Sequence, residues 1–404
     1  MSSLLPVEEA LGRVVASARA RPTQAAVTVD LLDGLGLVLA EDVIADLDVP
    51  GEDNSAMDGY ALRAADAEQP LPVVQRIPAG APGVKLEPGT AARIFTGAAV
   101  PDGADAVVMQ EDCIEQNGLL RISGICKVGQ NIRRRGQDLL ANTAVLATGR
   151  TLRPQDLGLL ASLGRATARV YQPLRVAILS TGDELIEPGS GTPRRGQLYN
   201  SNRYTLSGLL RALHMEVIDC GIVADDPQAT AQALQSAAAR ADCVISSGGV
   251  SVGEEDHVRN QVERLGQLDL WKLAIKPGKP LAFGRIGDTP FLGLPGNPTS
   301  VFVTFCLIAR PFLCALQGVE EAEAPRLHAQ AGFSVDKPGI RCEYLRVTLS
   351  NTATGLQAER FPNQSSGVLS SVSHSNALAV IPPGKTVAMG DPVEVLLLDG
   401  LAAS

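Results

Sequence analysis

Between residues 175 and 247, short apolar runs alternate with helical segments, and this alternation constrains the fold more than any other feature of the chain. The runs RVAILS, MEVIDCGIV and CVISS predict strands, and Ser201–Leu213 and Pro227–Arg240 between them have helical periodicity. Such alternation produces a parallel sheet with right-handed crossovers and helices on both faces. Ligands of these sheets bind beyond the carboxyl ends of the strands. We therefore expect a site at that edge.

Three segments rich in glycine and proline follow apolar runs and should reach the same edge. They are SSGGVSVGEED, KLAIKPGKP and GLPGNPTS, all between Ser246 and Ser300. Glycine allows positive φ and close approach of a ligand, so the first segment can turn backbone N–H groups toward a phosphate. The positions concerned are Ser247, Gly248, Gly249 and Gly253.

The GLPGNPTS segment constrains its turn at nearly every position. It precedes a predicted helix, Thr299–Leu316, in which Pro311 should cause a kink or a break. The first N–H groups of that helix should face the crevice and favour an anion. The turn residues assigned to this site are Pro295, Gly296, Asn297 and Pro298.

Carboxylates follow separate strands of the predicted sheet. Hard oxygen ligands suit Mg²⁺, which commonly takes one or two carboxylates together with phosphate and water. Asp226 directly precedes Pro227, which is also typical of a helix N-cap, so this residue has two interpretations. The carboxylates at the edge are Glu184, Asp225, Asp226 and Asp256.

Two lysines, Lys276 and Lys279, flank Pro277–Gly278 in IKPGKP. The prolines restrict the backbone and hold both ammonium groups near one place, which favours an oxyanion. A solvated hairpin turn is the alternative, because lysines usually lie on the surface. Lys272 could alternate outward from its strand.

Composition and motifs exclude several classes of function. The formal charge of −9 and the aromatic content of 3% argue against nucleic-acid binding, which needs a basic face or stacking rings. The seven cysteines are scattered without a C-x-x-C spacing, so neither a zinc site nor a disulfide framework is expected. No G-x-S-x-G, G-x-G-x-x-G or Walker motif follows a strand.

The amino terminus lacks the apolar core of a secretory signal, and no membrane-length apolar run occurs. We therefore expect a cytoplasmic protein.

The remaining sequence predicts flanking domains. Helical periodicity at Val7–Arg19 and Leu31–Leu39 is followed by short β-rich runs, and Arg153–Gly164 predicts a helix that could pack on the opening helices. The β-rich part would then be an insertion. After about Ala324, β runs separated by turns predict a small barrel. The expected division is a helical linker domain (1–45 and 150–172), a β insertion domain (46–149), a central α/β domain (173–324) and a C-terminal β barrel (325–404).

The insertion carries three further motifs, SAMDGYALR, IFTGAAVPDGADAVVMQED and GQNIRRRGQD. Asp58 and Thr96 lie in turns rather than on alternating strand faces, and loops on a rigid scaffold often reach an active site. Arg133, Arg134 and Arg135 are by default a solvated charge run.

Taken in order along nearly the whole chain, these motifs resemble those of the molybdopterin molybdenumtransferase family, called MoeA in bacteria and represented by the E domain of gephyrin. SAMDGYA, TGAAVPDGADAVV, NIRRRGQD, STGDEL, SSGGVSVGEEDH, KLAIKPGKPLAFG and GLPGNPTS carry the resemblance. It implies four domains, the third an α/β molybdopterin-binding unit, and elongated homodimers in which a partner's insertion loops complete each site. The implied reaction inserts molybdate into adenylated molybdopterin with Mg²⁺ and releases AMP and molybdenum cofactor.

The resemblance also implies roles for individual residues. Asp58, Thr96, Glu184, Asp225, Asp256, Lys276 and Lys279 correspond to catalytic positions, with Glu184, Asp225 and Asp256 as metal ligands. Lys272, Arg346 and Ser366 join the glycine- and proline-rich turns as cofactor-binding residues, although NQSSGVLSS departs from the family's glycine–serine pattern near Gln364. Transient contact with other proteins of cofactor biosynthesis is implied as well.

Three alternatives remain open at this point. A molybdopterin adenylyltransferase shares the α/β unit, but it lacks the insertion domain and IKPGKP. A nicotinamide-nucleotide amidase of the competence-damage type shares a related unit without SAMDGYA. A non-catalytic scaffold, like gephyrin in its assembly role, would not need the acidic and lysine residues that this chain retains.

Overall fold

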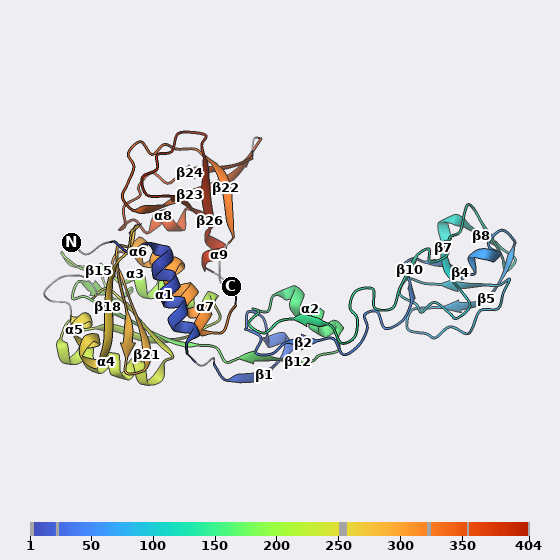
Figure 1. Cartoon of the computed structure of the whole chain (residues 1–404), viewed down its shortest axis with the longest axis horizontal. Coiled ribbons are helices and arrows are strands. Elements are labelled where there is room, and N and C mark those ends of the chain that lie inside the picture. Colours follow the sequence, from blue (N-terminus) through green and yellow to red (C-terminus); the bar gives the residue numbers. More distant parts are fainter. Residues whose placement is uncertain (1–3, 22–23, 250–256, 321–324, 354, 403–404) are drawn as a thin grey trace. The chain divides into compact units, whose positions relative to one another are not determined.

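The computed structural model describes residues 4–21, 24–249, 257–320, 325–353 and 355–402. These residues form two compact units (Figure 1). Unit 1 comprises residues 1–40, 149–153 and 167–404 apart from its undescribed positions, and unit 2 comprises 41–148 and 154–166.

Unit 1 is built around a mixed sheet. Its central strands run parallel, as the alternating pattern predicts, but β20 pairs antiparallel with β21 and β18 pairs antiparallel with β20 at one edge. The strands in spatial order are β16 (Glu216–Val223), β13 (Arg175–Thr181), β17 (Cys243–Ser247), β21 (Thr289–Leu294), β20 (Pro280–Ile286) and β18 (Gly266–Lys272).

Helices cover both faces of this sheet because successive residues of each strand point in opposite directions. Val176 and Ile178 pack in a core with α1 (Val7–Arg19), α3 (Ser201–Ala212), α6 (Pro298–Thr304) and α7 (Arg310–Leu316). Ala177 and Leu179 pack in a second core with α4 (Pro227–Arg240) and α5 (His257–Leu265). Figure 1 shows α1 beside α7 and α4 beside α5.

The predicted helix near Thr299–Leu316 is continuous but irregular. A π-helical segment, Phe305–Ala309, joins α6 to α7 just before Pro311, so the helix is not broken there and its irregularity is a change of helix type. Proline lacks the N–H needed for regular helical bonding, so a local change of helix type accommodates it. Within the described ranges this stretch is the one helix long and apolar enough to span a bilayer, yet 89% of that window is buried inside the protein, as in a core helix.

The carboxyl-terminal part of unit 1 is a small closed barrel, as expected. Strand β25 pairs with both β26 and β23, so the chain of strand pairings returns to its start. In order around the ring the strands are β23 (Cys342–Thr352), β24 (Gly355–Arg360), β22 (Arg326–Ala331), β26 (Pro392–Leu397) and β25 (Ala377–Ile381), and the short helices α8 (Ser370–Ser373) and α9 (Leu398–Ala402) accompany them.

One further short strand and two two-stranded ribbons belong to unit 1. Strand β19 (Ile275–Lys276) adds to the barrel by parallel pairing with β23. Strand β1 (Ala26–Asp30) pairs with β12 (Thr167–Tyr171). Strand β14 (Leu185–Ile186) pairs with β15 (Leu198–Tyr199) in a ribbon that follows β13.

Unit 2 contains the β-rich insertion. Tyr60 and Leu62 pack in one apolar cluster and Ala61 in another, so both faces of its main sheet are covered. The strands in spatial order are β7 (Ala106–Met109), β4 (Gly59–Leu62), β6 (Ala91–Ile94), β5 (Leu71–Ile77), β9 (Leu119–Ile122) and β8 (Cys113–Gln116). The unit also holds helix α2 (Pro154–Ser162) and the strands β2 (Val43–Ile44), β3 (Asn54–Ser55), β10 (Ile132–Arg133) and β11 (Ala144–Leu146).

One expectation for the amino-terminal region is wrong. Leu31–Leu39 does not form a helix: only Leu31–Asp33 makes a single 3-10 turn. The N–H of Leu39 instead donates to the carbonyl of Arg150, and Val38 forms an antiparallel bridge with Thr151. This pairing makes the backbone extended despite its helical periodicity. Helix α1 packs against α7 in the core of unit 1, whereas α2 belongs to unit 2.

Candidate active site

A cavity of about 1130 Å³ opens where β13, β17 and β21 end, and it is lined by the turns that the sequence singled out. Its volume slightly exceeds that of common small-molecule pockets, so it can hold an extended ligand. The predicted residues that line it are Glu184, Asp225, Ser247, Gly248, Gly249, Lys276, Lys279, Pro295, Gly296, Asn297, Pro298 and Ser366.

The turn after β17 requires glycine. Gly249 has φ of 68°, and a Cβ at this position would lie 2.5 Å from Cγ2 of Val258 and 2.8 Å from Oγ1 of Thr181. A side chain would therefore be strained and would also collide with the first turn of α5. This tight packing keeps the main chain of Gly248–Gly249 at the wall of the cavity.

Glu184 and Asp225 are exposed carboxylates in the cavity lining, and neither has an ion pair within the described ranges. The carboxylate of Glu184 lies over the backbone of Gly182, where an added Cβ would come within 2.4 Å of Oε2. Asp226, by contrast, caps α4: its Oδ1 accepts from the N–H groups of Gln228 at 3.0 Å and Ala229 at 2.8 Å. The N-cap interpretation of Asp226 is thus confirmed.

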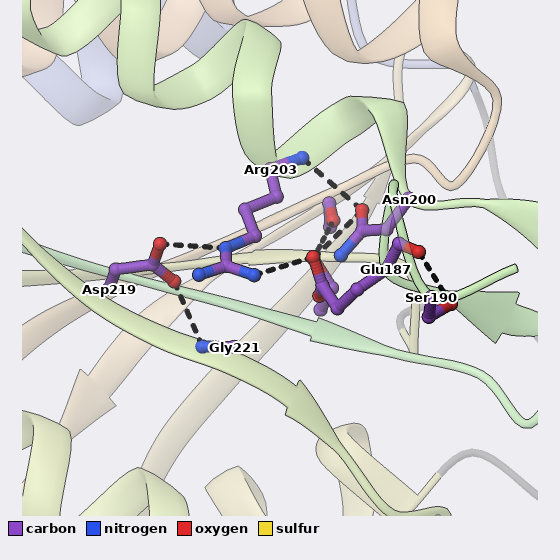
Figure 2. A network of polar contacts seen from close by, with 8 residues as sticks. Glu187, Ser190, Asn200, Arg203, Asp219 and Gly221 are labelled. Atoms are coloured by element: carbon purple, nitrogen blue, oxygen red, sulfur yellow. Dashed lines mark hydrogen bonds and ion pairs between the residues drawn. The ribbon is translucent and has the colours of Figure 1, made fainter.

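Arg203 on α3 fastens the β14–β15 ribbon to the sheet (Figure 2). Its Nε donates to Oδ2 of Asp219 on β16 at 2.6 Å, and its Nη1 lies 2.6 Å from Oε2 of Glu187, which directly follows β14. The hydrogen bond to Asp219 is the main reason that the pKa of Arg203 rises above its ordinary value. The ribbon supplies Glu184, Leu185, Leu198 and Tyr199 to the cavity wall.

Three buried polar side chains, two of which line the cavity, form a chain of contacts. The hydroxyls of Ser180 and Ser247 lie 3.1 Å apart, and Ser180 also donates to Oδ1 of Asn200 at 3.4 Å. Asn200 caps α3 by accepting from the Arg203 N–H at 3.3 Å. These contacts tie the ends of β13 and β17 to the start of α3 and so hold the wall in place.

The two lysines of IKPGKP differ in their surroundings. Nζ of Lys276 donates to Oε1 of Glu343 on β23 at 3.0 Å. Lys279 is exposed in the cavity lining and has no ion pair with the residues that the structure describes. Arg341, another lining residue, donates to the carbonyl of Ile275 at 3.1 Å and so fastens the lysine turn to the barrel.

The barrel contributes residues 364–367 and 369 to the cavity lining. Buried Arg346 supports this segment from behind: its backbone N–H donates to Oε1 of Gln364 at 3.0 Å, its Nη2 donates to the Ser365 carbonyl at 3.3 Å, and its Nε donates to the Ser371 hydroxyl at 3.0 Å. Burial lowers the pKa of Arg346 to about 10.

The N–H of Thr299 is already engaged by this segment, since it donates to the carbonyl of Ser366 at 3.0 Å. The expectation that this N–H faces an anion is therefore wrong. The start of α6 instead anchors the barrel segment, because the Thr299 hydroxyl also donates to the Val368 carbonyl at 3.0 Å.

Lys272 and Arg346, which were assigned to the site, do not line the cavity. Lys272 ends the edge strand β18, where it is exposed, and Arg346 lies buried behind the wall. Gly253 and Asp256 lie outside the described residues.

Sequence reasoning missed several lining residues, among them Asn202, whose Nδ2 donates to the Gly296 carbonyl at 2.7 Å. An asparagine just inside a predicted helix start, near the expected ligand edge, was the available signal. Arg341 gave no local signal, and only the family resemblance pointed to the segment near Gln364, because the positions of both depend on how the barrel packs. The lining residues that were missed include Asn200, Ser201, Asn202, Arg341, Gln364 and Ser365.

In unit 2, the structure brings Asp58 and Thr96 together. Oδ1 of Asp58 accepts from both the N–H and the hydroxyl of Thr96, each at 2.7 Å. The backbone N–H of Thr96 is the principal cause that holds the pKa of Asp58 below its usual value. Two of the three arginines of the run have acidic partners: Arg134 contacts Asp53 at 2.6 Å and Arg135 contacts Asp48.

A divalent cation with hard-ligand preferences fits the donor set of the cavity. Glu184 and Asp225 supply two carboxylates without ionic partners in the described structure, and Mg²⁺ commonly uses one or two carboxylates with phosphate oxygens and water. No cluster of three or more His, Cys, Asp or Glu residues occurs in the described ranges, so a closed all-protein metal cage is absent there.

The α/β domain of unit 1 carries glycine-rich turns and lysines in the lining of this cavity. Residues 177–315 match the family model for the probable molybdopterin binding domain. Residues 5–164 match the MoeA N-terminal region (domain I and II), and residues 328–398 match the MoeA C-terminal region (domain IV).

Named relatives cover nearly the whole chain. It is 40% identical to the molybdopterin molybdenumtransferase of Haemophilus influenzae over 91% of this chain and 92% of that protein, and 39% identical to that of a Nostoc species over 92% and 88%. A crystal structure of a molybdopterin biosynthesis MoeA protein from Pyrococcus horikoshii matches with a TM-score of 0.83 at 30% identity, covering 98% of this chain and all of that one. The chain belongs to the molybdopterin molybdenumtransferase family, whose members are transferases of molybdenum cofactor biosynthesis.

Proposed function

We propose that the chain inserts molybdate into adenylated molybdopterin, releasing AMP and molybdenum cofactor. The single observation that carries the proposal is the cavity of unit 1, which gathers carboxylates, lysines and a glycine-rich turn from separate segments. A phosphorylated pterin needs anion-binding backbone, and molybdate needs cationic side chains. Both are present in this one cavity of a molybdenumtransferase-family chain.

Mg²⁺ is the divalent cation that we propose for Glu184 and Asp225. When bound there it would supply positive charge beside the phosphoanhydride of the substrate. Asp256 belongs to the same proposal through its SSGGVSVGEED motif and lies outside the described residues.

The chain's own residues would bind the phosphate and molybdate groups. The glycine turn at Gly248–Gly249 would hold phosphate oxygens with backbone N–H groups. Lys279, which has no ion pair in the described structure, would bind molybdate, and Lys276 would assist. Pro295, Gly296, Asn297, Pro298 and Ser366 would shape the opposite part of the lining.

Lys272 and Arg346 are proposed in supporting roles rather than as direct contacts. Arg346 is buried and bonds the segment that carries Ser366, so its loss would disturb that segment. Lys272 is exposed at the end of β18 and would contribute only long-range charge.

We further propose a cytoplasmic homodimer in which Asp58 and Thr96 of a second copy complete the site. Two observations support this proposal: Asp58 and Thr96 share an exposed turn, and the chain has the MoeA N-terminal region of the family. Contact with other proteins of cofactor biosynthesis would be transient.

The test is a defined reaction with the purified chain, adenylated molybdopterin, molybdate and Mg²⁺. We expect AMP and molybdenum cofactor to appear together, and omission of molybdate to prevent cofactor formation. Consumption of ATP with unadenylated molybdopterin would instead identify an adenylyltransferase. A folded chain with neither reaction would favour a scaffold.

A further inference from the structure

One of the two lysines in the cavity carries its own counter-ion. The Lys276 Nζ to Glu343 Oε1 contact of 3.0 Å joins the α/β domain to the barrel, whereas Lys279 forms no such pair within the described ranges. Both lysines line the same cavity, three positions apart. The two ammonium groups are therefore unequal before any ligand arrives.

The backbone places Glu343 beside Lys276. Strands β19 and β23 pair in parallel with Lys276 opposite Glu343, and the N–H of Cys342 donates to the carbonyl of Ala274 at 2.8 Å. The Arg341 bond to the Ile275 carbonyl adds a second tie on the preceding residue. The carboxylate is thus presented to Lys276 by the sheet rather than by chance contact of two long side chains.

The pair is accessible enough to exchange partners. The side chain of Lys276 is 49% exposed and that of Glu343 is 20% exposed. At this exposure an ion pair is modest in strength, so a doubly charged ligand that also gains Lys279 can compete for the ammonium group. A carboxylate that remains nearby would still repel an anion.

We propose that Glu343 is a competing counter-ion that sets how tightly the cavity holds a tetrahedral oxyanion. It weakens capture of free oxyanions at Lys276 and leaves Lys279 as the first point of attraction. This inference rests on the proposed function, because it takes the lysine turn to be the oxyanion site.

The test measures molybdate binding by calorimetry in wild type, Glu343→Gln, Lys276→Gln, the double variant and Lys279→Gln, with sulfate as a second probe. We expect Glu343→Gln to bind both anions about 1.5- to 5-fold more tightly, the range of a partly exposed ion pair. The gain should vanish in the Lys276→Gln background and persist in the Lys279→Gln background. A structural tie between domains would change the unfolding midpoint but would not produce this pattern.

Glu343→Asp provides a second variant, since a shorter carboxylate withdraws from Lys276 while retaining its charge, and it should give a smaller gain. Unchanged or weaker anion binding in folded Glu343→Gln or Glu343→Asp, while Lys279→Gln still weakens binding, would overturn the inference alone. A Glu343→Gln gain that survives in the Lys276→Gln background would also overturn it. If neither wild type nor any variant bound molybdate, both this inference and the proposed oxyanion site would fail.

Discussion

The cavity of unit 1 and the Asp58–Thr96 turn of unit 2 hold their polar groups in opposite ways. In the cavity, Glu184, Asp225 and Lys279 come from separate segments and have no ion pairs within the described structure. In the turn, Asp58 is satisfied locally by two hydrogen bonds from Thr96. Side chains without a protein partner can bind a ligand without breaking a protein hydrogen bond, whereas Asp58 and Thr96 already hold each other in a fixed conformation. Substitutions in the cavity should therefore affect activity more than stability.

The largest effect is expected from Lys279→Gln. Loss of an ammonium group that meets an anionic ligand should reduce kcat/KM for molybdate-dependent AMP release by about 100-fold, the scale of a removed electrostatic contact. The unfolding midpoint should hardly change, because Lys279 is exposed. Lys385→Gln, at an exposed barrel turn outside the cavity, is the matched control and should retain activity. Equal activity of the two variants would show that Lys279 is not a binding residue of the cavity.

Gly249→Ala should reduce stability where the other cavity variants do not. A positive φ together with a Cβ 2.5 Å from Val258 should cost about 1–3 kcal/mol, measured by urea unfolding. Gly296→Ala is the matched control, since the nearest atom to an added Cβ is 3.9 Å away. A similar loss in both variants would show that the turn at Gly249 is not specially constrained.

Glu187→Gln should loosen the ribbon next to Glu184. The lost contact with Arg203 is partly exposed, so we expect an effect of about 0.2–1 kcal/mol. It should appear as faster amide exchange at Leu198 and Asn200, whose N–H groups bond the carbonyls of Glu184 and Ile186. Glu263→Gln, which removes a helical pair with Arg259 at 3.1 Å, should leave these amides unchanged.

The smallest effect is expected at the turn of unit 2. Thr96→Val removes the hydroxyl but keeps the backbone N–H, which is the larger cause of the lowered pKa of Asp58. The pKa should therefore rise partway toward its ordinary value, as measured by carbon NMR titration. Because the folded pKa is depressed, the contribution of Asp58 to stability is present above about pH 4 and is lost as the pH falls through the folded pKa. An unchanged pKa would contradict the assigned hydrogen bond.

Local signals explain why much of the α/β domain could be predicted from the sequence. Helix α4 begins at Pro227 and ends at Arg240 as predicted, because the Asp226 cap and Pro227 define its start. Parallel topology brought Glu184, Asp225 and the glycine turn to one edge without any need for side-chain detail.

The parts that could not be predicted depend on packing between distant segments. Residues 36–39 have helical periodicity, but pairing with residues 149–152 makes them extended. The Glu343 contact exists because β23 pairs with β19, a register that no local pattern encodes. The barrel wall at Gln364–Ser366 depends on bonds from Arg346 and Thr299, which are distant in the sequence. Lys272 lies outside the cavity for the same reason, since strand pairing places it at the end of an edge strand.

The most direct test of the account compares neighbouring carboxylates that the structure assigns to different tasks. Turnover of adenylated molybdopterin with molybdate should be measured over a Mg²⁺ titration for Asp225→Asn and Asp226→Asn. Because Asp225 is proposed to bind Mg²⁺, we expect Asp225→Asn to lose at least about tenfold in activity or Mg²⁺ affinity at unchanged stability. Asp226→Asn should remain close to wild type, because asparagine also caps helices well. Full activity of Asp225→Asn, or an equal loss in both variants, would contradict the assignment of this cavity as the active site.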